Sequence, residues 1–430
     1  MWWLVTSAVG GPAEASGLRR VRESVGPRED SGVEEPSRHG TALGLSATNI
    51  MIAKAARVFV FGLISIMTPV YLAAIGFPPF LVGVCLGAII SGNVISNVLV
   101  VRYEERVGRK SFLQVFSLMI IASGILLSWT TSFPLILLAF LIGNISTTGT
   151  EAGPFQSIEA GILPSLVPRE SVNRSFGSYN LIGYSALSVG AFAASAPSYF
   201  QNSLLAFRSL YLFYGLVGLL LLLLYQPLGA HQFEGEQKPR ELSPAARREI
   251  TKLSGLFSID AFGGGFVSQS LLSYWFFLAY AVSLKDLGIV FFVVNIIAAI
   301  STFGASLVAD KIGNLRTMVY THLLSNAFLV GIPLAGSLLG SLLFLFARQS
   351  VSQMDVPTRQ AFMAGLFNEK ERVPANAITN ISRSISSIFG SPASGALLGI
   401  GLVSAPLLVA GFSKTLYDGL IFTLYRRRAK

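Results

Sequence analysis

The chain has 430 residues, of which 52% are hydrophobic and only 13% are charged. A soluble domain carries roughly 25% charged residues, and charge-free runs such as 111–130, 210–225 and 287–308 are typical of membrane-spanning helices. These features exclude a soluble enzyme, a nucleic-acid-binding domain and a disordered chain. They predict an all-α integral membrane protein.

Residues 1–46 differ in composition from the rest of the chain. They hold five Arg and six Asp or Glu among many Gly, Ser and Pro, a composition that cannot bury a core. We expect a disordered cytoplasmic tail, or a native protein that starts at Met51. The apolar run 2–10 resembles a signal peptide only loosely, because no basic residue precedes it.

Counting apolar segments against a spanning length of about 20 residues predicts twelve transmembrane helices. They cover residues 50–74, 80–101, 111–130, 134–154, 175–196, 206–226, 252–280, 285–308, 316–334, 336–355, 375–398 and 404–425. The charged stretch 227–251 is predicted to be a cytoplasmic loop. It separates an N-terminal six-helix bundle, residues 47–226, from a C-terminal six-helix bundle, residues 252–430.

The positions of the basic residues test this map, because cytoplasmic connectors of membrane proteins are enriched in Lys and Arg. With a cytoplasmic N-terminus, the inside connectors hold most of these residues, and the outside connectors hold little beyond Arg208 and Lys285. The formal net charge of +10 therefore reflects topology rather than nucleic-acid binding. The prediction is a multi-pass protein of the cell membrane with both termini in the cytoplasm.

Two connectors repeat one pattern. The run Glu105-Arg106-Val107-Gly108 follows the second span, and Asp310-Lys311-Ile312-Gly313 follows the eighth span, 205 positions later. The fourth and tenth spans also end alike, each with an acid shortly before a proline. These matches indicate a duplicated six-helix unit, which is a transporter architecture with its binding site between the halves.

The acid-base-x-glycine connector resembles the signature loop of the major facilitator superfamily, and the likeness covers residues 50–425. The run 353–360 and the pair Glu371-Arg372 are similar to the tenth-to-eleventh connector of bacterial and archaeal multidrug-efflux-like members. The family implies two pseudo-symmetric six-helix bundles in the lipid bilayer that move a small-molecule substrate by alternating access, with H+ as a candidate coupling ion. We expect a monomer without a cofactor or a metal site.

We predict that the two repeated connectors form a cytoplasmic gate. It comprises Glu105, Arg106, Gly108 and Arg109 in the first half and Asp310, Lys311 and Gly313 in the second half. The acid can cap a neighbouring helix or pair with an arginine, and the glycine permits a close backbone approach. The alternative is a solvated turn whose basic residues only set topology.

Charged residues inside membrane spans cost about 2.5–3.5 kcal/mol each on insertion scales, so each one is a functional candidate. Arg348, Asp355 and Arg359 follow each other at helical spacing and are expected to share one face. Lys414 and Asp418, four residues apart, are expected to neutralise each other. The full predicted proton and substrate cavity comprises Asn144, Glu151, Asp260, Gln269, Trp275, Asn295, Arg348, Gln353, Asp355, Arg359 and Arg383.

Among these acids, Glu151 and Asp260 rank above Asp355 as proton carriers. Asp355 has two arginines within helical reach, whereas Glu151 has only Asn144 at the matching position. A desolvated, unpaired carboxylate takes up a proton more readily than a paired one. The alternative for Asp260 is a helix cap or a partner for an arginine.

The sequence favours a secondary active transporter of a small apolar or amphipathic solute. Proton-coupled efflux is one mode open to such a carrier, and uptake of a small metabolite is another. An integral-membrane enzyme or a non-transporting sensor is less favoured, because an enzyme needs clustered His, Asp or Glu, and the three histidines, at positions 39, 231 and 322, are scattered. No Gly-x-x-x-x-Gly-Lys-Ser/Thr loop occurs, which excludes direct ATP drive within this chain.

Overall fold

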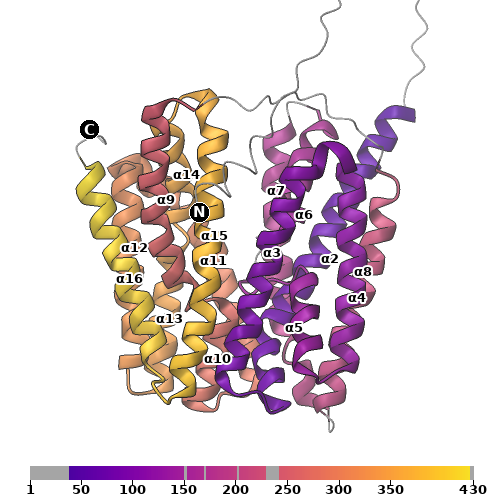
Figure 1. The fold of residues 1–430 in the computed structure, drawn as a ribbon, viewed down its shortest axis with the longest axis vertical. Helices are drawn as coiled ribbons and strands as arrows, with labels where there is room; N and C mark the ends of the chain where they lie inside the picture. Colours follow the sequence, from indigo (N-terminus) through magenta and orange to yellow (C-terminus); the bar gives the residue numbers. More distant parts are fainter. Residues whose placement is uncertain (1–37, 150–152, 169–170, 201–202, 229–241, 427–430) are drawn as a thin grey trace, which may run out of the picture.

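The computed structural model describes residues 38–149, 153–168, 171–200, 203–228 and 242–426. This part of the chain folds into helices, and no β-strand occurs in it. Figure 1 shows the helices standing roughly parallel in two groups side by side, one from each half of the chain. The predicted all-α fold is confirmed.

The helices of the first half follow the predicted order. They are α2 (Arg38–Ala74), α3 (Pro79–Val107), α4 (Arg109–Trp129), α5 (Phe133–Ile142), α6 (Pro154–Ile162), α7 (Val172–Ala193) and α8 (Ser203–Tyr225). Two short 3₁₀ turns, η1 (Leu163–Ser165) and η3 (Ala196–Tyr199), flank α7.

The second half repeats this order. Its helices are α9 (Pro244–Gly265), α10 (Gln269–Tyr280), α11 (Leu284–Ile312), α12 (Asn314–Leu334), α13 (Leu338–Ser352), α14 (Asp355–Leu366), α15 (Glu369–Gly399) and α16 (Ala405–Tyr425). Seven of the described helices, α2, α3, α4, α8, α11, α12 and α16, contain a segment long and apolar enough to cross a membrane. The count of twelve crossings stays a prediction.

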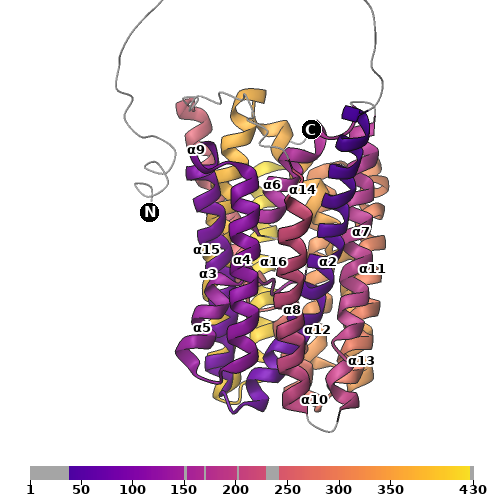
Figure 2. The ribbon, with the colours of Figure 1, turned by 90° about the vertical axis from the view of Figure 1, so that its right-hand side faces the viewer.

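Three of the predicted spans correspond to interrupted helices. In both views α5, α10 and α13 lie toward one end of the molecule, and α6, α9 and α14 lie toward the other end (Figures 1 and 2). The sequence predicted the apolar α5 and α13 but placed span ends where α6 and α14 begin. The reason is proline: Pro154 and Pro357 end an apolar run, yet proline fits the first turn of a new helix.

Glycine lets the two halves approach closely where α3 packs against α15. A Cβ on Gly83 would lie 3.0 Å from the Cα of Gly395 and 2.5 Å from the carbonyl oxygen of Ser391. Both contacts are with backbone, which cannot move aside as a flexible side chain can. Small residues at this crossing therefore set the distance between the halves.

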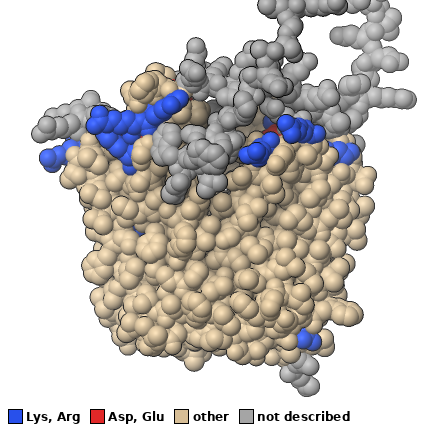
Figure 3. Space-filling view, in the orientation of Figure 1, with Lys and Arg blue, Asp and Glu red and all other residues tan. Residues whose placement is uncertain are grey.

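The outer surface supports a position within a lipid bilayer. In the view of Figure 3 a broad band carries no Lys, Arg, Asp or Glu, and most basic side chains lie along one edge. Exposed large apolar residues such as Leu216, Leu343 and Leu416 lie on the outside of the helices. We call the end that carries the connectors at Gly108 and Gly313 the basic end, and the opposite end the distal end.

Candidate functional site

The two repeated connectors have the same backbone geometry. Gly108 has φ 83° and ψ 147°, and Gly313 has φ 84° and ψ 156°. Each glycine ends one helix and begins the next, and its N–H donates to a carbonyl four residues back at 2.8 Å. Side chains with a Cβ rarely adopt this positive φ, so both positions favour glycine.

The charged side chains of the connectors differ between the halves. Arg109 pairs with Glu104 and donates to the carbonyl oxygen of Gly161 at 3.1 Å. The side chain of Glu105 lies outside the described residues, and Arg106 is exposed. Asp310 and Lys311 are exposed, and Asp310 forms no ion pair with the described residues. The role of these residues as a gate stays a prediction.

Polar side chains from four segments lie at one depth. Gln269 and Asn295 each lie eleven residues from the distal end of their helix, and Arg348 lies ten residues from it. Asn144 lies eleven residues after the start of α5. Eleven residues of helix span about 16 Å, which is half of a hydrocarbon core of about 30 Å. We call these four residues the mid-depth layer.

The mid-depth layer coincides with the helix interruptions. Asn144 has a positive φ of 51° and lies between α5 and α6, and Gln269 begins α10 after the break that follows α9. Arg348 lies one turn before the break between α13 and α14. Interrupted helices expose backbone and side-chain polar groups, and they are tolerated in a membrane only where they line a protein-enclosed site.

Hydrogen bonds join the two halves next to this layer. The Gln269 amide donates to the Ser65 hydroxyl at 2.8 Å. Ser270 donates to the carbonyl oxygen of Thr147 through its backbone N–H at 3.0 Å and through its hydroxyl at 3.1 Å. The Ser273 hydroxyl donates to the carbonyl oxygen of Ile66 at 3.1 Å. These contacts run along α10, toward the distal end.

A buried ionic cluster lies in the first half. Arg57 and Glu159 form an ion pair at 2.7 Å, and both side chains are fully buried. Tyr179 and Tyr225 donate to the same carboxylate at 2.7 and 2.6 Å. The Arg57 guanidinium also lies 4.6 Å from the centre of the Phe155 ring. A carboxylate with this many donors holds α2, α6, α7 and α8 together.

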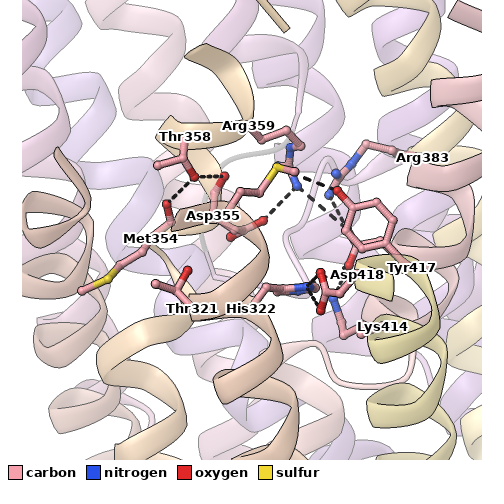
Figure 4. Close-up of polar contacts among 12 residues, drawn as sticks. Thr321, His322, Met354, Asp355, Thr358, Arg359, Arg383, Lys414, Tyr417 and Asp418 are labelled. Atoms are coloured by element: carbon pink, nitrogen blue, oxygen red, sulfur yellow. Dashed lines mark hydrogen bonds and ion pairs between the residues drawn. The ribbon is translucent and has the colours of Figure 1, made fainter. Parts of the chain in front are cut away.

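A second ionic cluster, centred on Asp260, lies in the second half. The Lys414 ammonium lies 2.7 Å from its carboxylate, and Arg383 and Arg359 lie at 3.3 and 3.9 Å. Asp355 pairs with Arg359 at 3.0 Å, one turn along α14 (Figure 4). The structure thus brings together four predicted cavity residues, and Asp260 pairs with Lys414 as well as with two arginines. Its role as a proton carrier stays a prediction.

His322 extends this second cluster and was missed by the sequence analysis. Its Nδ1 lies 2.8 Å from Asp418, and its Nε2 lies 3.6 Å from Asp260 (Figure 4). Asn326 donates to the same Asp418 carboxylate at 2.9 Å. Lys414 therefore pairs with Asp260 and not with Asp418, because α12 supplies Asp418 with a histidine. His322 and Asn326 are four residues apart in an apolar span, a spacing that could have indicated the site.

The remaining predicted residues lie elsewhere. The Trp275 indole donates to the carbonyl oxygen of Val403 at 2.7 Å, which fastens α10 to the connector before α16. Gln353 lies in the turn between α13 and α14, so Arg348 and Asp355 are on different helices rather than on one continuous face. Glu151 lies outside the described residues.

The family model of the Major Facilitator Superfamily matches residues 50–352. The chain belongs to this superfamily. It is therefore a membrane transporter by family rather than an enzyme. A curated relative, the Saccharomyces cerevisiae membrane protein YJR124C, is 24% identical over 375 residues, which cover 78% of this chain and 84% of the relative.

Solved structures of superfamily transporters share the fold. The nucleoside transporter NupG matches with a TM-score of 0.72 at 11% identity, over 88% of this chain and all of its own. A D-xylose-proton symporter matches with a TM-score of 0.66 at 16% identity, over 89% and 96% of the two chains. A bacterial homolog of the human lysosomal transporter Spinster, in an inward-facing conformation, matches with a TM-score of 0.62 at 12% identity, over 89% and 98%. At these identities the likeness concerns the fold alone.

Proposed function

We propose that this superfamily member is a secondary carrier that binds a small amphipathic solute at the mid-depth layer and moves it by alternating access. The observation that carries the proposal is the position of the polar side chains at matching helix interruptions. The breaks after α5 and before α14 fall in corresponding segments of the two halves. Interrupted segments in corresponding positions are a pointer to the binding site of a transporter.

The contacts between the halves support a distal-closed state of the cycle. The hydrogen bonds of Gln269, Ser270 and Ser273 to the first half all lie on α10. The close glycine contact between Gly83 and Gly395 also lies in the distal parts of α3 and α15. In our proposal the basic end faces the cytoplasm, and opening the distal end requires these contacts to separate.

Proton coupling belongs to the same proposal, and His322 is its centre. A histidine is the side chain that ordinarily changes charge between pH 5 and 8. The groups that face its ring are the carboxylates of Asp418 and Asp260, the Asn326 amide and the Tyr417 ring at 5.9 Å. A proton gained by His322 would strengthen its contacts with the carboxylates of Asp418 and Asp260. A proton lost would weaken the contact with Asp260, which would then be held by its lysine and arginine partners.

The test is transport by purified protein in proteoliposomes with an imposed pH gradient. A panel of radiolabelled solutes is assayed with the gradient in both directions, which also determines whether the carrier works in uptake or efflux. His322→Gln is expected to abolish pH-driven accumulation while solute exchange without a gradient continues. Full pH-driven accumulation by this variant would refute coupling through His322.

Two amide variants test the acids ranked first from the sequence. Glu151→Gln and Asp260→Asn keep the shape of the side chain and remove its titration. The loss of pH-driven accumulation with retained exchange in either variant would assign the coupling proton to that acid instead. If neither the native chain nor any variant exchanges a solute, the carrier function itself is contradicted.

A further inference from the structure

One partly buried arginine of the mid-depth layer, Arg348, makes no direct contact with a described acid. Arg359, Arg383 and Lys414 each form an ion pair with Asp260 or Asp355. Arg348 forms no ion pair within 4.0 Å among the described residues. Its hydrogen bond among the described residues runs from Nη1 to the neighbouring Gln349 side chain at 3.3 Å. Asp355 attracts the guanidinium without touching it, and a cation without a direct ion pair at this depth is costly in a membrane.

The charge balance of the second half gives the same result. The membrane-embedded acids of its described helices are Asp260, Asp355 and Asp418, and the cations are Arg348, Arg359, Arg383 and Lys414. With His322 neutral, the cations exceed the acids by one, since four minus three is one. In the contacts described above, three of the cations surround Asp260 and Asp355, and Asp418 contacts His322. Arg348 is the cation that forms no ion pair within 4.0 Å among the described residues.

Among the described residues, buried polar atoms without a hydrogen bond occur near this layer in both halves. In the second half the unpaired buried atoms include two donors, Arg348 Nε and Asn295 Nδ2. In the first half they include two acceptors, Asn144 Oδ1 and Asn93 Oδ1, whose amide nitrogens already donate to carbonyl oxygens. A buried donor or acceptor without a partner costs about 1–3 kcal/mol, so these atoms are poised for a ligand.

Arg348 and Asn295 lie on neighbouring helices at a similar depth. Their helices α13 and α11 pack against each other, and the two residues lie ten and eleven residues from the distal ends of these helices. At this depth Arg348 is too far from either membrane surface to extend its charge into water. A guanidinium offers several N–H donors in one plane, which suits a carboxylate or a phosphate.

We infer that Arg348, with Asn295, binds an acidic group of the transported solute. The inference rests on the proposed carrier function and names its substrate class: a small amphipathic organic anion, with the carboxylate or phosphate ester against the second half. The unpaired amide oxygens of Asn144 and Asn93 would accept a hydrogen bond from a hydroxyl or amino group at the other end of the solute.

The test measures thermal unfolding of the full-length protein in detergent with four probes of similar size. Benzoate and phenyl phosphate carry the two acidic groups, benzamide is neutral, and benzylamine is cationic. Wild type is expected to be stabilised by the acids and not by benzamide or benzylamine, and the better acid identifies the group. Arg348→Gln should weaken the apparent affinity for the acid about 10- to 100-fold, as expected for a charge-assisted hydrogen bond.

Lys414→Gln is the matched control, because it also removes one buried positive charge. Lys414 is paired with Asp260, so this variant should unfold at a lower temperature than wild type and keep the acid-induced shift. Arg348→Gln without probe should unfold at the same or a higher temperature, since no ion pair is lost.

Three results would overturn the anion site. These are an unfolding temperature of Arg348→Gln as low as that of Lys414→Gln, an acid-induced shift that persists in Arg348→Gln, and acids that shift wild type no more than benzamide does. The carrier function would stand if proteoliposomes still exchanged a neutral solute. If acid binding depends on Arg348 but no solute is exchanged, the anion site is supported and the proposed carrier function is contradicted.

Discussion

The first-half cluster offers a prediction whose size follows from its hydrogen bonds. In Glu159→Gln the side chain keeps its shape but loses its charge and one acceptor atom. Each carboxylate oxygen accepts from Arg57 and from one tyrosine, Oε1 from Tyr225 and Oε2 from Tyr179. Either orientation of the amide therefore sets an NH₂ group against two donors.

The expected loss is large because no water reaches the pair. Arg57 and Glu159 are fully buried, and breaking a buried ion pair by removing one partner costs about 3–5 kcal/mol. The measurement is the free energy of unfolding in mixed micelles, followed by tryptophan fluorescence. A control, Arg57→Met combined with Glu159→Gln, should recover most of the loss, because the buried charge is gone.

A loss below about 1 kcal/mol in Glu159→Gln, the size of an exposed ion pair, would refute this reasoning. It would mean that water or another charge compensates Arg57 inside the bundle. A double variant no more stable than the single variant would also refute it, since the cost would then come from lost packing.

Two further predictions concern the connectors and the topology. Gly108→Ala and Gly313→Ala should each destabilise the protein by about 1–3 kcal/mol through backbone strain alone. Their positive φ with a ψ of 147° or 156° is a region that side chains with a Cβ rarely adopt, and no described atom lies within 4 Å of either Cβ position. Gly177→Ala, in an open helical position, should not destabilise the protein, and equal melting temperatures of all three variants would contradict the strain. To test the topology, single cysteines are placed at the exposed Arg248 and Ser283 in a chain whose native cysteine is replaced by alanine. The two cysteines should react with impermeant reagents from opposite sides of the membrane. Reaction from the same side would contradict the predicted topology.

The sequence was sufficient for the helices whose apolar runs are long. The spans at 80–101, 111–130 and 404–425 agree closely with α3, α4 and α16, because an apolar run of that length has few other uses in a protein. The repeated connectors were also predictable, since the pattern of an acid, a base and a glycine recurs in the amino-acid sequence. Their matching positive φ angles give the repeat a physical basis.

The helix interruptions were not predictable from hydropathy. Pro154 begins α6, and Pro357 lies in the first turn of α14. In the sequence, such a proline is equally compatible with the end of one helix and the start of another. The partners of the buried charges were even harder to predict from the sequence. Asp260 and Lys414 are 154 residues apart, and only packing of α9 against α16 brings them together.

The two ionic clusters occupy corresponding helices but have opposite polarity. In the first half the cation Arg57 lies on the first segment and the acid Glu159 on the fourth; in the second half the acid Asp260 lies on the first segment and the cation Arg359 on the fourth. The positions of buried charge thus follow the repeat, whereas their sign does not.

The clusters also differ in completeness, and that difference assigns unequal roles to the halves. The Arg57–Glu159 pair is fully buried, and two tyrosines donate to its carboxylate. Around Asp260 the Arg383 side chain is 22% exposed, and a histidine contacts two carboxylates. Arg348 adds a positive charge that forms no ion pair within 4.0 Å among the described residues. Under the two proposals, a bound anion and an added proton would act most directly on this half. In an alternating-access cycle the first half would then move as a rigid body, and the second half would sense what is bound.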